Sequence, residues 1–427
     1  MKTLFALILS ATTLATAQTG VPTAPNPQHT LAELSISQAQ EAIQKKPAVF
    51  LGYNLLAAAL VRRARETSDP TFYAQAEAAV QKSAKLAPKS FETEKIRVSI
   101  LLGKHDFPAA LDAANALNKQ VPDDVTVYGF QTEADAALGN YEEAETAAQW
   151  MLNLRPGNVP ALIQAAKLRR LFGDSDGSYE LFQLAYESTL LTENEERAWL
   201  LAQMGDLRLS SGKTEAAGEL LEQALNAFPD YPLALSRMAK VRTVQTRYDE
   251  ALGLLRQCYK SAPRAENLYA LAKALRNAKH KAEADQAFAD FETKSLQESG
   301  NKDNSNRDLI FYYTDYAKQP AKALRVAEFE YAWRKDVYTL DAYAWALHIA
   351  GQNAEALRQI KLALSVGVRD AQIFRHAGEI SLKSGDIRGA ELYLKQAVEL
   401  DPFDSEQARV ALAGINVMTR ETADHNR

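Results

Sequence analysis

The chain of 427 residues contains one cysteine, Cys258, and few glycines (19) or prolines (15). A single cysteine cannot form an intramolecular disulfide, so packing alone must stabilise the fold. The scarcity of glycine and proline argues against collagen-like, linker-rich and turn-dense all-β proteins. Six histidines are scattered with no pair three or four residues apart, so the spacing typical of metal ligands is absent.

Motifs for phosphate and calcium binding are incomplete. Gly212-Lys213-Thr214 matches the end of a phosphate-binding loop, but the glycine required five residues earlier is replaced by Leu207. Asp174-Ser175-Asp176-Gly177 lacks the ligand spacing and the closing glutamate of a calcium loop. We therefore expect no cofactor, no metal and no catalytic residues, and we predict that the protein is not an enzyme.

Charge gives no support for binding nucleic acid. The chain has 49 basic and 54 acidic residues and a formal net charge of -5, so nonspecific attraction to phosphate is not expected. After the first residues, no apolar run reaches the roughly 18 residues of a membrane-spanning helix.

The first 17 residues have the pattern of a signal peptide. A lysine is followed by an apolar run from Leu4 to Leu14 and by Ala15-Thr16-Ala17, whose small residues suit a signal peptidase. The pattern predicts cleavage between Ala17 and Gln18 and export to the periplasm or the outside; an uncleaved anchor is the alternative. Residues 18–30 contain three prolines and are predicted to form an extended linker.

A period of 34 residues organises the remainder of the chain. Small residues that we call the anchors recur at spacings of 34, 34, 34, 39, 34, 33, 39, 33 and 34; they are Ala76, Ala110, Ala144, Ser178, Ala217, Ala251, Ala284, Ala323, Ala356 and Ala390. Proline occurs twelve residues after six anchors, where it would stop a helix, and glycine occurs five residues before five of them, where it would permit a tight turn.

This pattern resembles the tetratricopeptide repeat, a helix-turn-helix unit that stacks into a solenoid. The stretches ADAALGNYEEAETAAQWMLNLRPGN and AGEISLKSGDIRGAELYLKQAVELDPFD carry the resemblance most clearly. It implies an all-α, right-handed superhelical solenoid of about ten units over residues 47–404. The subtype that grips chaperone C-terminal carboxylates is not indicated, because no window supplies its lysine, asparagine and arginine set.

Two insertions and two terminal segments suggest a division of the solenoid. Extra residues near 192–197 and 299–303 would separate blocks 47–190, 198–298 and 304–404. Residues 31–47 are predicted to be a capping half repeat, and residues 405–427 a C-terminal capping helix and tail.

The resemblance also indicates which side chains face the concave groove. In this family the first helix of each unit lines that surface, which becomes basic near its middle and aromatic with acidic residues farther on. The predicted partner-binding residues are Lys167, Arg170, Lys240, Tyr269, Lys273, Arg276, Asp308, Tyr312, Asp315, Tyr316, Tyr338, Asp341 and Trp345. Whether the tyrosines are exposed or pack against their neighbours remains open from the sequence.

Two functional classes follow. The first is a noncatalytic scaffold of the bacterial cell envelope that binds a peptide or partner protein in the groove. The second is a glycan- or peptidoglycan-binding accessory factor of envelope assembly or polysaccharide export, with the groove aromatics as sugar platforms. Partner identity and oligomeric state do not follow from the sequence.

Overall fold

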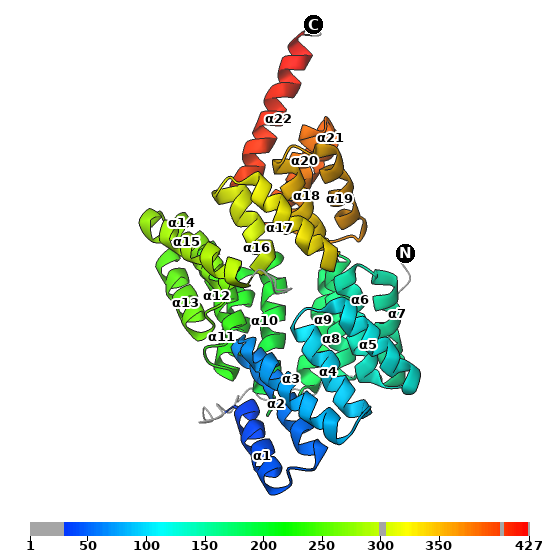
Figure 1. The fold of residues 1–427 in the computed structure, drawn as a ribbon. Helices are drawn as coiled ribbons and strands as arrows, with labels where there is room; N and C mark the ends of the chain where they lie inside the picture. The colour runs from blue at the N-terminus through cyan, green and yellow to red at the C-terminus, as the bar shows by residue number, and fades with distance from the viewer. Residues whose placement is uncertain (1–29, 299–304, 402–404, 426–427) are drawn as a thin grey trace, which may run out of the picture.

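The computed structural model describes residues 30–298, 305–401 and 405–425, and every regular element in them is helical. The predicted signal peptide, most of the linker and the insertion at 299–303 lie outside these residues. The prediction of an all-α solenoid of stacked helix pairs is confirmed (Figure 1).

Each repeat contributes two antiparallel helices that pack on each other. The first helices are α2 (Phe50–Thr67), α4 (Phe91–Gly103), α6 (Val125–Leu138), α8 (Val159–Leu171), α10 (Asn194–Ser210), α12 (Pro232–Val244), α14 (Ala265–Asn277), α16 (Ser305–Phe311) with the π-helix η1 (Tyr312–Tyr316), α18 (Val337–Ile349) and α20 (Ala371–Lys383). The second helices are α3 (Thr71–Leu86), α5 (Phe107–Gln120), α7 (Tyr141–Leu154), α9 (Ser175–Ser188), α11 (Thr214–Ala227), α13 (Tyr248–Ser261), α15 (Lys281–Glu298), α17 (Pro320–Trp333), α19 (Asn353–Ser365) and α21 (Ile387–Leu400).

The ten anchors explain why the repeat demands small residues. Each lies in the first turns of a second helix, and none is more than 1% exposed. A larger side chain there would separate the paired helices. Ser178 is the one polar anchor, and its hydroxyl donates a hydrogen bond to the carbonyl oxygen of Ala166 at 2.8 Å. The buried hydroxyl is therefore satisfied without disturbing the packing.

In nine of the ten units, the turn between the two helices uses a left-handed residue five positions before the anchor, whereas the first unit uses Ser68. Gly139 and Gly173 occupy that position with φ of 83° and 81°. Other units place a larger residue there, such as His105 at 57° and Thr246 at 59°. The turn geometry is thus common to the repeats, although only some of them use the residue that adopts it without strain.

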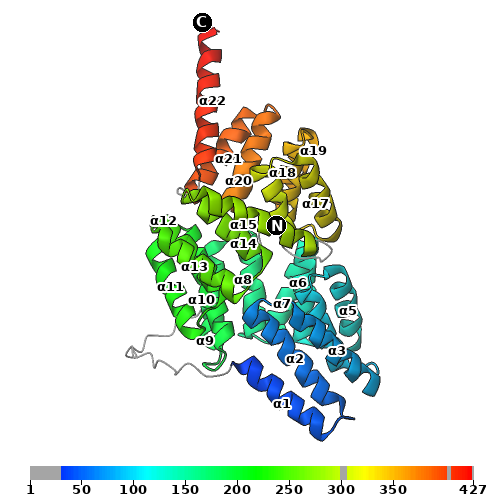
Figure 2. The same ribbon diagram turned by 60° about the vertical axis from the view of Figure 1, so that its left-hand side comes forward.

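Helices also flank the repeats at both ends. At the N-terminal end, α1 (Leu31–Lys45) begins with a capping box between Thr30 and Glu33, and the buried Glu66 of α2 accepts a hydrogen bond from the Thr30 hydroxyl at 2.6 Å. At the other end, α22 (Glu406–His425) covers most of the segment 405–427 that was predicted to be a capping helix and tail. Its far end projects from the molecule in both ribbon views (Figures 1 and 2).

The superhelix curves far enough for distant repeats to touch. Figure 2 shows α6 beside α17, and two hydrogen bonds join the loops that follow these helices. The amide of Lys335 donates to the carbonyl oxygen of Ala137 at 3.1 Å, and the amide of Val337 donates to the hydroxyl of Tyr141 at 3.0 Å. One turn of the solenoid therefore closes onto itself through the loops that follow α6 and α17.

A second long-range contact involves the insertion near residues 192–197. Arg62 at the end of α2 forms an ion pair with Glu193 at 2.5 Å, and Arg65 lies 3.9 Å from Glu195. Arg197 donates to the carbonyl oxygens of Tyr186 and Thr189, both at 3.1 Å. The inserted residues are thus held to α2 and to the end of α9.

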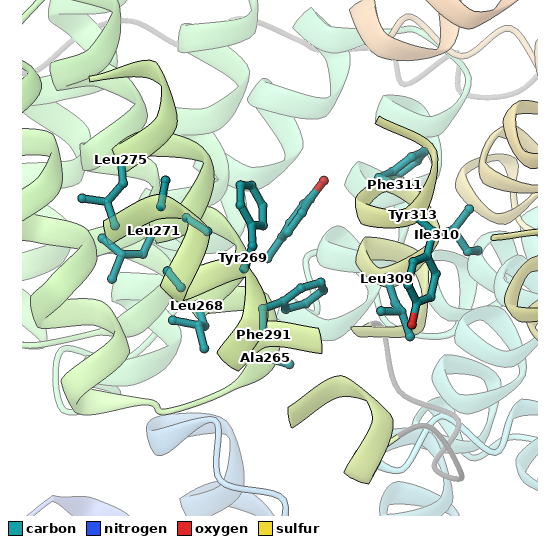
Figure 3. Packing of buried hydrophobic residues seen from close by; sticks show 14 of the residues in the cluster. Ala265, Leu268, Tyr269, Leu271, Leu275, Phe291, Leu309, Ile310, Phe311 and Tyr313 are labelled. Atoms are coloured by element: carbon teal, nitrogen blue, oxygen red, sulfur yellow. The ribbon is translucent and has the colours of Figure 1, made fainter. Parts of the chain in front are cut away.

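The largest hydrophobic cluster runs from α12 to α18 and spans the insertion at 299–303. Figure 3 shows Tyr269 and Phe291 on one side of this cluster and Phe311 and Tyr313 on the other. Tyr269 packs 4.9 Å, centroid to centroid, from Phe291. The helices on the two sides of the insertion therefore share one core, and the proposed division into three blocks stays a prediction.

Candidate partner-binding surface

Side chains of successive first helices meet along what we call the inner surface, defined by the thirteen predicted groove residues and their direct neighbours. Figure 1 places α8 and α10 near the middle of the molecule, with α5, α7, α11 and α13 toward its outside. Asp206 of α10 links two neighbouring first helices, because it pairs with Arg170 of α8 at 2.5 Å and with Arg237 of α12 at 3.2 Å. Polar side chains thus join α8, α10 and α12 on this surface.

The middle of the inner surface is basic. Lys240 of α12 is exposed, Lys273 of α14 is half-buried, and neither forms an ion pair among the described residues. Lys167 is also exposed and lies 3.6 Å from Glu133. Because Asp206 is shared between two arginines, the positive charge around it exceeds the negative charge.

The pKa values of Asp206 and Lys240 reflect this excess of positive charge. Burial alone would raise the pKa of Asp206, but Arg237, Arg170 and Lys240 hold it well below its usual range. The charge of Arg237, followed by partial desolvation, lowers the pKa of Lys240 to about 8, although Asp206 opposes this change. Since the Lys240 side chain is exposed, we take charge repulsion as the main cause.

The surface extends toward the opposite side of the superhelix. Asp370 at the start of α20 interacts electrostatically with both Lys240 and Arg170, and Tyr338 of α18 interacts with Arg170. Arg307 of α16 lies 5.4 Å from the centre of the Tyr338 ring. The inner surfaces of α8 and α12 therefore face those of α18 and α20, which follows from the curvature of the solenoid.

Aromatic and basic side chains alternate along α14 and η1. Lys273 lies 5.5 Å from the ring centre of Tyr269, and Arg276 lies 6.0 Å from that of Tyr316. Arg276 also pairs with Asp285 at 3.2 Å. These cation–π contacts keep the two basic side chains against the aromatic cluster.

A buried polar network joins η1, α18 and α20. The indole of Trp345 donates to Asp315 at 2.8 Å and stacks on His376 with ring centroids 4.2 Å apart. One ring nitrogen of His376 lies 2.7 Å from Asp341, and the other lies 2.7 Å from the guanidinium of Arg375. Because an arginine can only donate, His376 accepts there and bears its proton on the nitrogen facing Asp341.

Burial sets the ionisation of this network. It raises the pKa of Asp341 to about 7, against the opposing charges of Arg375 and Arg307. Burial, helped by the charge of Arg375, also holds the pKa of His376 well below its usual range. The network thus keeps His376 neutral.

The predicted groove residues fall into three groups by exposure. Lys167, Lys240 and Arg276 are exposed, and the half-buried group comprises Arg170, Lys273, Asp308, Tyr312, Asp315, Tyr316 and Tyr338. Tyr269, Asp341 and Trp345 are buried, at 6%, 2% and 4% exposure. For these three, packing of neighbouring helices removes the side chain from the surface on which the sequence had placed it. Tyr269 and Tyr316 pack edge to face at 6.2 Å, which is the packed alternative that the sequence left open.

Sequence reasoning missed five residues at the inner surface, namely Asp206, Arg237, Arg307, Asp370 and Arg375, and the fully buried His376 that packs against Trp345. One signal was available for Asp206, which precedes Lys240 by 34 residues and therefore has the same place in its repeat. Asp370 approaches Lys240 only because the superhelix curves, and no local pattern in the sequence reports that approach.

We also searched the described residues for a second candidate site in hollows and in groups of metal-ligating side chains. Two hollows among the described residues lie between α13, α14 and α15 and between α1, α2 and α3, and neither includes a predicted groove residue. Within the described ranges, histidine, cysteine and acidic side chains form no group of three suited to a metal ion.

In the same part of the chain, no helix combines the length and apolar character needed to cross a bilayer. Cys258 is fully buried, and burial raises the pKa of its thiol to about 12.

Comparisons with known proteins agree with the repeat. A family model described as tetratricopeptide repeat matches residues 208–257. No curated protein matches the chain. Similar solved structures include a human IFIT1 dimer with PPP-AAAA (13% identity, 86% of this chain, 94% of that chain, TM-score 0.48) and yeast Tom70 (12%, 91%, 96%, 0.41). A tetratricopeptide repeat protein from Parabacteroides merdae is similar over 60% of this chain and 98% of its own (18% identity, TM-score 0.37).

The class of protein follows from the matched repeat and the buried anchors of the helix pairs. It is an all-α solenoid, a class typical of noncatalytic scaffolds for other proteins. Residues 208–257 match the tetratricopeptide repeat, and the other helix pairs of the described residues share its buried small anchor.

Proposed function

We propose that the protein is a noncatalytic scaffold of the bacterial cell envelope that binds a partner protein or peptide along its inner surface. The observation that carries this proposal is the continuous row of half-buried and exposed polar and aromatic side chains on successive first helices. Arg170, Lys240, Lys273, Tyr312 and Tyr338 are all at least partly accessible on it. Such a row suits an extended segment that contacts several repeats at once.

The envelope location rests on the signal-peptide pattern of residues 1–17 alone. We propose cleavage between Ala17 and Gln18 and function in the periplasm or outside the cell. N-terminal sequencing of the protein from a fractionated cell tests it: a mature chain starting at Gln18 is expected, and an intact chain in the cytosol would contradict export.

Binding of a glycan is less well supported by the structure. A sugar platform requires an open aromatic face. The ring of Trp345 is stacked on His376 and lies 4.9 Å from the guanidinium of Arg375, and the ring of Tyr312 stacks on Phe288 at 5.5 Å. Binding of a protein partner is therefore the function that the geometry supports best.

Capture from an envelope extract tests the scaffold function. A doubly substituted protein, Tyr312→Ala and Tyr338→Ala, should lose the partner that the wild-type protein captures, because both side chains are accessible on the inner surface. Tyr248 on the outer helix α13 is 44% exposed, so Tyr248→Ala provides the matched control and should retain the partner. Equal capture by the two variants would contradict the assignment of the inner surface.

A further inference from the structure

We propose that the inner surface between α8 and α14 binds an acidic segment of the partner, whose carboxylates contact Arg170, Arg237, Lys240 and Lys273. This inference rests on the proposed scaffold function and adds the chemistry of the bound segment. It concerns one site, centred on Lys240, rather than the inner surface as a whole.

Unbalanced charge is the first reason. Arg170, Arg237 and Lys240 surround the carboxylate of Asp206, and Lys273 of α14 repels Lys240. The acidic group that acts on Lys240 from the facing side is Asp370. Two positive charges therefore remain without a counter-charge in the described part of the chain. Two other basic groups of the inner surface have acidic partners, since Lys167 pairs with Glu133 and Arg276 with Asp285.

The arginine geometry is the second reason. Asp206 uses one oxygen for Nη2 of Arg170 and the other for Nε of Arg237. A guanidinium carries five N–H donors, so each arginine retains donors for a further carboxylate after contacting Asp206. Asp206 thus holds the two guanidinium groups in place beside the exposed ammonium of Lys240.

The repulsion felt by Lys240 is the third reason. Arg237 on its own helix and Lys273 on α14 lower the pKa of Lys240, whereas Asp206 on α10 and Asp370 on α20 oppose them, and the result is about 8. A bound carboxylate would relieve this repulsion and raise the pKa. Binding of an acidic segment should consequently take up protons above pH 8 and weaken as the pH rises through that value.

The same charges favour a short acidic peptide over a nucleic acid. Proteins that hold nucleic acid by its phosphates commonly neutralise several of them, with about 6–10 contacts in strong binders. Here only two positive charges are unbalanced, and Asp370 faces Lys240 from the other side of the superhelix. A long polyanion would also meet Asp308 and Asp315 on the adjoining helices.

Binding of fluorescein-labelled hexaglutamate, measured by fluorescence anisotropy at pH 6.5 and low salt, tests the proposal. Hexaglutamine of the same length is the uncharged control, and 5′-phosphorylated hexathymidylate is the nucleic-acid probe. We expect hexaglutamate to bind the wild-type protein and Lys240→Gln to weaken binding about tenfold, the effect of losing one charge-assisted contact. Lys361→Gln makes the same change on the outer helix α19, where Lys361 is exposed, and should leave binding unchanged.

A second variant separates charge from shape and tests the pH dependence. Lys240→Arg keeps the charge and does not titrate, so it should bind hexaglutamate at pH 6.5 and lose less affinity than the wild-type protein at pH 9. Circular dichroism checks that each variant is folded. Equal affinities of Lys240→Gln and Lys361→Gln, or tighter binding of hexathymidylate than of hexaglutamate, would overturn the proposal.

The two proposals can fail separately. If the Tyr312 and Tyr338 substitutions abolish capture of the partner but hexaglutamate does not bind, the scaffold function stands and the acidic chemistry is wrong. If hexaglutamate binds through Lys240 but capture is unchanged by both inner-surface tyrosine substitutions, the acidic site stands and the proposed scaffold surface is wrong.

Discussion

The backbone amide of Val337 donates a hydrogen bond to the hydroxyl of Tyr141 across a separation of 196 residues. Tyr141 begins a second helix in one repeat, and Val337 begins a first helix six units later. The contact shows that the solenoid completes a turn and closes on itself. It also brings Asp370 and Tyr338 opposite Arg170 and Lys240, so the inner surface is bounded by repeats from both ends of that turn.

Removal of the Tyr141 hydroxyl should loosen this closure. Tyr141→Phe leaves the Val337 amide without its side-chain acceptor, which we expect to weaken the local structure by about 1–2 kcal/mol. Hydrogen exchange measured by mass spectrometry on peptides covering residues 334–340 should accelerate roughly 5- to 30-fold, whereas exchange around α12 should not change.

Tyr248→Phe is the matched control, because Tyr248 is an exposed tyrosine at the same place in another repeat. It should leave the exchange of residues 334–340 unchanged. Identical exchange of this segment in wild-type protein and Tyr141→Phe would show that the hydrogen bond does not hold the superhelical turn together.

Two glycines with the same turn conformation should respond differently to alanine. Gly139 and Gly212 both have positive φ, 83° and 72°, so each substitution should destabilise the turn by about 1 kcal/mol. A Cβ at position 139 would also lie 2.9 Å from the carbonyl oxygen of Lys335, whereas a Cβ at position 212 would meet nothing within 4 Å. We therefore expect Gly139→Ala to lower the free energy of unfolding by about 1–3 kcal/mol more than Gly212→Ala, and the urea midpoint to fall accordingly. Equal midpoints would argue that the loop at Lys335 does not press on the turn.

Asp341 and His376 should make opposing contributions to the pH dependence of the free energy of unfolding, so substituting Asp341 should reveal the contribution of His376. The pKa of His376 is lowered on folding, so protonation of the unfolded chain below about pH 6.5 reduces stability. The pKa of Asp341 is raised to about 7, so the folded protein takes up a proton between about pH 4 and 7, which increases stability as the pH falls. The two effects oppose each other and nearly cancel between about pH 4.5 and 6.5.

Asp341→Asn removes the proton uptake by position 341 in the folded protein and leaves the destabilising effect of His376. Its free energy of unfolding should fall more steeply than that of the wild-type protein below pH 6.5, by up to about 1.4 kcal/mol per pH unit. Urea unfolding at pH 5, 6 and 7.5 measures the difference in slope. Parallel pH dependence in the two proteins would mean that Asp341 does not take up the proton assigned to it.

The repeat and the packing of its anchors were predictable because both depend on residues within one 34-residue unit. Ser178 could be assigned as an anchor from spacing alone, and it is buried like the alanines. The burial of Trp345 was not predictable, because it depends on His376 and Arg375 of the next repeat filling the space against its ring. The approach of Asp370 to Lys240 depends on the accumulated curvature of several units, to which each unit contributes only a small rotation.

Site-specific photo-crosslinking tests most directly whether the inner surface binds the partner. A photoreactive benzoylphenylalanine would replace Tyr338 on the inner surface or Tyr248 on the outer surface, in cells that express the protein at its natural level. We predict a crosslink to one partner protein from position 338 that weakens when Lys240→Gln is added, and no such crosslink from position 248. Crosslinking of that partner from position 248 and not from position 338 would contradict the assignment.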